Sequence, residues 1–80
     1  MTRAEILNGL NEVFRDVFDD ESIVVNDSTT ADDIDGWDSL EHINLVLAIE
    51  QHFRIKFSMK EVTTFKNVGE MIDAMLNKVK

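Results

Sequence analysis

The residues best suited to chemistry lie in one acidic stretch, Asp32–Glu41, which reads DDIDGWDSLE. A calcium loop of the EF-hand type needs oxygen ligands at its first, third and fifth positions, Gly at the sixth and Glu at the twelfth. Placing Gly36 sixth puts Ala31 first and His42 twelfth, so the opening ligand and the bidentate acid are both missing. His42 and His52 would lie about 15 Å apart along one helix, too far to share a zinc ion. The stretch therefore predicts no metal site.

Ser39 is the candidate nucleophile of this stretch. A catalytic serine needs a base within hydrogen-bond reach and a third group that orients the base. His42 follows one helical turn later with no obvious orienting partner, and the G-x-S-x-G pattern of a nucleophile elbow is absent. We therefore expect no catalytic residue and no enzymatic activity of the chain's own.

The position of Ser39 suggests a different chemistry. If Asp38 is the N-cap of a helix, Ser39 is its first residue and lies near amide hydrogens that helix geometry leaves unpaired. A phosphate on that hydroxyl would sit at the positive end of the helix dipole, which stabilises an anion. From the residues alone, two interpretations stay open: Ser39 carries a phosphodiester, or it is an ordinary helix-start residue.

Four segments that would position this stretch have apolar residues at helical spacing, each after an N-cap signature. The segments are 2–18, 38–53, 58–65 and 67–79. The connection 19–37 is rich in turn-forming residues but contains enough apolar side chains to pack onto the helices, with one short helical turn near 30–33. We predict an all-α fold: a single domain over residues 1–80, a small four-helix bundle with a long loop between the first two helices and a short third helix.

The charge distribution narrows the choice of partners. The chain has 80 residues, no Cys and a net charge of −8. No Lys or Arg occurs between Asp16 and Phe53, whereas the bases gather after that point. Such a field repels nucleic acid and anionic lipid and favours a basic protein surface. The longest apolar run, Leu45–Ile49, is far too short for a membrane span, and without a secretion signal we expect a cytoplasmic protein, most simply a monomer.

The segment Gly36–Phe53, GWDSLEHINLVLAIEQHF, resembles the attachment site and second helix of acyl carrier proteins. The predicted order of helices and the acidic charge extend this resemblance over the whole chain. It implies that Ser39 carries 4′-phosphopantetheine, delivered from coenzyme A by a phosphopantetheinyl transferase. It also implies that acyl groups are held on the arm as thioesters and presented to acyl-loading and acyl-processing enzymes with basic docking patches.

The resemblance assigns further residues around Ser39. Those implied in partner recognition are Asp38, Leu40, Glu41, Ile43 and Glu50, with Asp38 also facing the transferase and its magnesium. Those expected to shelter an acyl chain between the second and third helices are Ile43, Leu47, Met59 and Val62. For each single carboxylate, the alternative interpretation is a solvated helix face.

Several positions depart from the pattern of housekeeping fatty-acid carriers. Neutral Asn44, Gln51 and His52 replace an acidic run, and bases follow at 54, 56, 60 and 66. Trp37 replaces a small residue, and we expect it to cover the helix start by packing toward His42. These departures favour a specialised acyl pathway, such as polyketide or modified-lipid chemistry. An aminoacyl or peptidyl carrier, or a non-covalent acidic interaction module, remains as an alternative.

Overall fold

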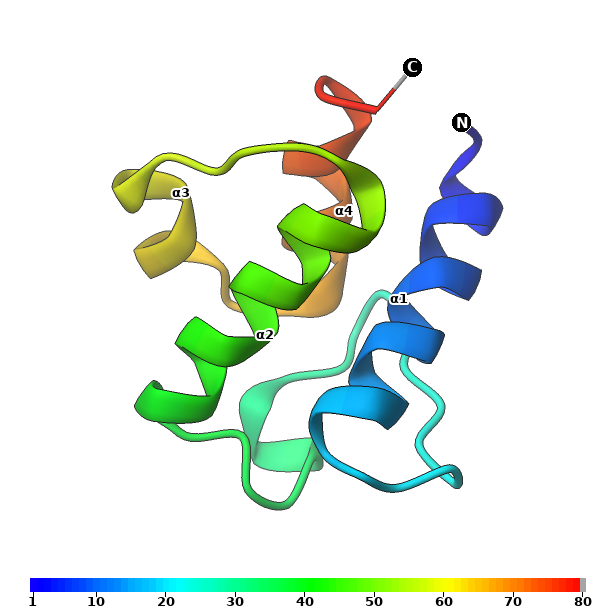
Figure 1. The fold of residues 1–80 in the computed structure, drawn as a ribbon, viewed down its shortest axis with the longest axis vertical. Helices are drawn as coiled ribbons and strands as arrows, with labels where there is room; N and C mark the ends of the chain where they lie inside the picture. The colour runs from blue at the N-terminus through cyan, green and yellow to red at the C-terminus, as the bar shows by residue number, and fades with distance from the viewer. Residues whose placement is uncertain (80) are drawn as a thin grey trace.

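The computed structural model describes residues 1–79, and over that range it contains four α-helices, one short 3-10 turn and no strand. The elements are α1 (Arg3–Val17), η1 (Ala31–Asp33), α2 (Ser39–Phe53), α3 (Met59–Thr64) and α4 (Val68–Leu76). The predicted all-α bundle, with its long loop and short third helix, is confirmed. Figure 1 shows α2 between α1 and α3, and α1 packs against both α2 and α4.

Local caps explain where the helices begin. Thr2 and Ser58 each form the predicted reciprocal capping box, with Glu5 and Glu61 respectively. Asp38 and Asn67 also cap their helices, but the second half of the box differs there. The Glu41 carboxylate accepts from the Asn44 side chain at 3.1 Å, and the Glu70 carboxylate accepts from the Lys66 amide at 3.3 Å. One cap bond suffices to set each start, because it satisfies an otherwise unpaired amide.

The core joins α1, α2 and α4 through side chains that are almost completely buried. They include Ile6, Leu10 and Phe14 of α1, Leu45 and Ile49 of α2, and Met71, Ile72 and Met75 of α4. Gly9 allows α1 and α2 to approach closely, because a Cβ there would lie 2.5 Å from the Phe53 ring. The helix-propensity cost of this glycine, about 1 kcal/mol relative to Ala, is thus tied to close packing.

The long loop is fixed to α1 by a buried asparagine. The Asn11 Oδ1 accepts from the Val25 amide at 2.7 Å, and its Nδ2 donates to the Leu7 carbonyl at 3.1 Å. Val25 and Ile23 are buried beside it. The loop packs onto the bundle as its apolar residues predict.

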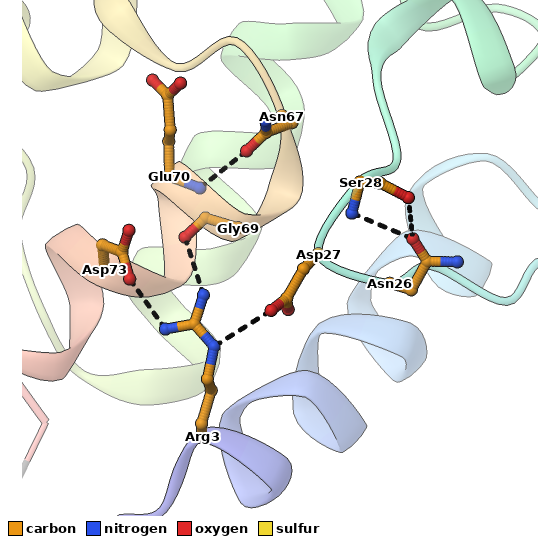
Figure 2. A network of polar contacts seen from close by, with 8 residues as sticks. All are labelled: Arg3, Asn26, Asp27, Ser28, Asn67, Gly69, Glu70 and Asp73. Carbon is orange, nitrogen blue, oxygen red and sulfur yellow. Dashed lines mark hydrogen bonds and ion pairs between the residues drawn. The ribbon is translucent and has the colours of Figure 1, made fainter.

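The same loop supplies the start of α4. The carbonyls of Thr29 and Asp27 accept from the amides of Val68 and Gly69, both at 2.9 Å. Arg3 adds a second connection at this place, shown in Figure 2. Its guanidinium donates to Asp73, Asp27 and the Gly69 carbonyl at 2.7, 3.2 and 3.3 Å. The bonds to Asp73 and then Asp27 raise the pKa of Arg3 above its ordinary value.

The end of α2 has an unusual backbone conformation. Arg54 adopts the left-handed region, with φ 57° and ψ 50°, and the Ile55 amide returns to the Glu50 carbonyl at 3.1 Å. This is the bonding of a Schellman motif, whose left-handed residue is usually glycine. A residue with a Cβ is strained there by about 1–2 kcal/mol.

We predict that Arg54→Gly stabilises the protein. Relief of the left-handed strain exceeds the added chain entropy of glycine, so the free energy of unfolding should rise by about 0.5–1 kcal/mol. Urea unfolding followed by circular dichroism measures the change. Arg54→Ala is the matched control, because it removes the charge but retains the Cβ. Equal stabilisation by both variants would show that backbone strain is not the cause.

Candidate functional site

Ser39 is the first residue of α2, and the cap holds it in place. The Asp38 side chain accepts from the Glu41 amide at 2.9 Å, and its carbonyl accepts from the His42 amide at 2.8 Å. Ser39 itself is exposed. Its hydroxyl therefore lies at the positive end of a 15-residue helix and is open to solvent.

A tight turn brings the chain to this cap. Gly36 has φ +85°, which residues with a side chain rarely adopt, and its carbonyl accepts from the Asp38 amide at 3.0 Å. The turn directs Trp37 back into the bundle, where its ring meets Phe14 edge-on at 5.2 Å. The start of α2 is thereby anchored in the core.

His42 connects Trp37 to α3. The Trp37 Nε1 donates to His42 Nδ1 at 3.0 Å, with the two rings stacked at 6.0 Å. Because Nδ1 accepts, the proton of the neutral imidazole is on Nε2, which donates to the Val62 carbonyl at 2.9 Å. The predicted packing of Trp37 toward His42 is present, and the bridge onward to Val62 was not predicted.

Helix α3 is further held by Glu61. Its carboxylate accepts from the Ser58 amide at 2.8 Å and pairs with Lys78 at 3.1 Å. The Ser58 amide, and after it Lys78, lowers the pKa of Glu61 below its ordinary value. This six-residue helix is thus fixed at its start by Glu61 and near its end by His42.

A cavity of about 490 Å³ opens beside Ser39, between the start of α2 and the end of α3. We call it the serine cavity. Its apolar lining includes Trp37, Ile43, Val62 and Phe65, and its polar lining includes Ser39, His42, Thr63, Lys66 and Asn67. Of the four residues predicted to shelter an acyl chain, it brings together Ile43 and Val62. Leu47 and Met59, 52% and 75% exposed, lie outside its described lining.

The residues predicted to recognise partners share the outer side of α2. Leu40, Ile43 and Leu47 form an exposed row at helical spacing, which we call the apolar stripe. Asp38 and Glu41 lie at its start. Glu50 also has a local partner, because its Oε2 accepts from the Phe57 amide at 2.8 Å.

Comparison with known proteins decides the family. Residues 8–75 match the family model described as the phosphopantetheine attachment site. The chain belongs to the acyl carrier protein family. An acyl carrier protein of Thermosynechococcus vestitus is 30% identical over 99% of this chain and 98% of its own length. One from Acidothermus cellulolyticus is 33% identical over 96% of this chain and 92% of its own length.

A solved structure supports the same family assignment. The holo acyl carrier protein of Geobacter metallireducens is 49% identical, with a TM-score of 0.83 over 90% of this chain and 83% of its own. The cofactor of the family is covalently bound 4′-phosphopantetheine, and its members work with a phosphopantetheinyl transferase and other partner enzymes. An exposed serine at a helix start beside a cavity fits that group. Within residues 1–79, no helix is long and apolar enough to cross a bilayer, and no cluster of three or more metal-binding side chains occurs.

For this acyl carrier protein, we predict that His42→Ala loosens α3. The variant loses the bonds to Trp37 and to the Val62 carbonyl, which together stabilise the fold by about 1–2 kcal/mol. Amide hydrogen exchange should accelerate more in residues 59–64 than in α1. His52→Ala is the control, since that exposed side chain makes no contact with α3: it approaches Glu12 at 3.9 Å and meets the Phe53 ring edge-on at 4.8 Å. Uniform acceleration in both helices would contradict a local role for His42.

Proposed function

We propose that Ser39 carries the 4′-phosphopantetheine arm and that the chain holds acyl groups as thioesters on it. The observation that supports this most is the free hydroxyl. Ser22 and Ser28 donate to Asp20 and Asn26 at 2.6 and 2.7 Å, and Ser58 caps α3. Within the described residues, Ser39 is the serine whose hydroxyl has no hydrogen-bond partner.

The start of α2 favours an anion on that hydroxyl, although acidic residues surround it. The first amides of α2 point toward Ser39, and the α2 dipole stabilises negative charge at its start. The Asp38 carboxylate accepts a hydrogen bond from the Glu41 amide at 2.9 Å. The site therefore suits a phosphodiester better than it suits a nucleophile, because His42 is already bonded on both ring nitrogens.

The proposed role is transport without catalysis. Acyl-loading and acyl-processing enzymes would approach the exposed start of α2, with basic side chains facing Asp38 and Glu41 and apolar ones on Leu40 and Ile43. The neutral and basic positions from Asn44 onward favour a specialised acyl pathway over housekeeping fatty-acid synthesis. A cytoplasmic location, a single domain and a monomeric state stay predictions.

Attachment at Ser39 can be tested by mass. Incubation of the apo protein with coenzyme A, magnesium and a broad-specificity phosphopantetheinyl transferase should add one phosphopantetheine to the wild type and none to Ser39→Ala. Ser22→Ala should be modified like the wild type. If the mass of the wild type does not increase, a non-covalent interaction module becomes the better interpretation. Which activating enzyme loads the holo form then separates an acyl from an aminoacyl carrier.

We further propose that the serine cavity shelters the start of the acyl chain. Ile43 and Val62 face it, and burying each additional methylene there contributes about 0.8 kcal/mol. Leu47 and Met59 would extend this wall only for longer chains, and methionine adapts easily to such variable shapes.

Loading should therefore change NMR methyl shifts in a defined order. A short acyl chain on the holo protein is expected to shift Ile43 and Val62, and only a longer chain to shift Leu47 and Met59. The unacylated holo protein provides the baseline, so that effects of the arm are subtracted. If short chains instead perturb Leu47 and Met59 first, the chain does not enter the serine cavity.

A further inference from the structure

The end of α2 farthest from Ser39 carries a second surface feature. A shallow groove of about 340 Å³ lies between the last turns of α2 and the segment that follows. We call it the distal groove. Its lining consists of Leu47, Glu50, Gln51, Arg54, Ile55 and Lys56. It combines apolar surface with two cations in a protein whose net charge is −8.

The two cations of the distal groove have no carboxylate partner in the described structure. Over residues 1–79, no acid lies within 4.0 Å of the charged group of Arg54 or Lys56, as is also true of Arg15, Lys60 and Lys66. The one acid of the groove, Glu50, is bonded to the Phe57 amide. Arg54 and Lys56 thus remain available for an anionic group from outside.

Backbone strain adds an independent argument for Arg54. Its φ of 57° is the conformation for which glycine is the favoured residue, so the chain presents a long cation at a position that disfavours any side chain. Strained positions of this kind concentrate at functional sites. Solubility does not explain a cation here, because the surplus of acids already provides the charge.

The distal groove is continuous with the apolar stripe. Leu47 is the last residue of the stripe and also lines the groove. From Ser39 to Arg54 the helix rises about 22 Å. Along the surface of α2 and the segment that follows it, acids therefore stand at the start, at Asp38 and Glu41, apolar side chains in the middle, and two cations at the far end.

We propose that the protein partner that handles the loaded carrier docks along this surface with opposite charges at its two ends: bases near Ser39 and a carboxylate in the distal groove, on Arg54 and Lys56. This rests on the proposed function, in that the partner is an enzyme acting on the arm. The surface selects against partners whose docking patch is basic throughout, because like charges would meet at the groove.

A second copy of the chain is the competing occupant. Two such surfaces placed antiparallel would also pair acids with bases, as an isologous interface requires. The charge of −8 on each copy opposes that arrangement. A partner of the stated charge pattern is therefore favoured over self-association.

Two synthetic amphipathic helices of about 20 residues serve as probes, long enough to span the surface. Both carry the same apolar row and the same bases at one end. The other end carries Glu in the bipolar peptide and Lys in the all-basic peptide. Dissociation constants for the holo protein are measured by amide-shift titration at fixed salt.

In Arg54→Gln/Lys56→Gln, we expect the preference for the bipolar over the all-basic peptide to fall by about fivefold. A loss of this size corresponds to the binding energy of two exposed ion pairs. Asn8→Asp/Asn26→Asp makes the net charge more negative by the same amount, at exposed positions outside the groove. It should leave the preference unchanged. This control separates local contact from the total charge.

Three results would overturn the proposal. The first is an equal loss of peptide preference in both double variants, and the second is that neither peptide binds. The third is a dimer, seen in sedimentation, that Arg54→Gln/Lys56→Gln dissociates. The last result would assign the surface to a second copy. The mass test on Ser39 is separate. If the arm attaches but the peptide preference does not respond, the docking proposal alone fails; the titration repeated on Ser39→Ala shows whether docking stands without the arm.

Discussion

The hydrogen bond from the Val25 amide to buried Asn11 is the contact on which the rest of the arrangement depends. It fixes the middle of a long loop to α1, and the loop then completes other elements. The loop carbonyls of Asp27 and Thr29 accept hydrogen bonds from the first amides of α4. The last residues of the loop turn at Gly36 and lead into α2. Leaving either group unpaired inside the protein would cost about 1–3 kcal/mol, so the loop has one strongly preferred position.

The proposed site combines a rigidly held helix start with an exposed surface. Trp37 and His42 bind the start of α2 to the core and to α3, while Leu40 and Leu47 stay open to solvent. Exposed apolar side chains promote association, but the negative net charge keeps copies of the chain apart. A carrier that meets several enzymes in turn needs both properties. Its attachment residue must be held in place, and its docking surface must stay exposed and not pack into the core.

The sequence predicted the helices and the position of Ser39 well, because caps and helical spacing act over a few residues. The bridge from His42 to Val62 spans 20 residues and was not predictable, since a histidine has many potential partners. The recognition role of Glu50 stays a prediction, and its bond from the Phe57 amide was not foreseen. That bond forms next to the left-handed turn at Arg54. The sequence does not predict this turn, because the residue there is not the glycine usual for such a conformation.

The Arg3 contacts have a kinetic consequence. They join residues 24, 66 and 70 positions apart, so both ends of the chain must be in place before they form. Contacts between residues so distant in sequence are slow to form, because loop closure precedes them. Interactions made after the transition state slow unfolding without accelerating folding. The Arg3 contacts therefore contribute to how long the native state persists once it has formed.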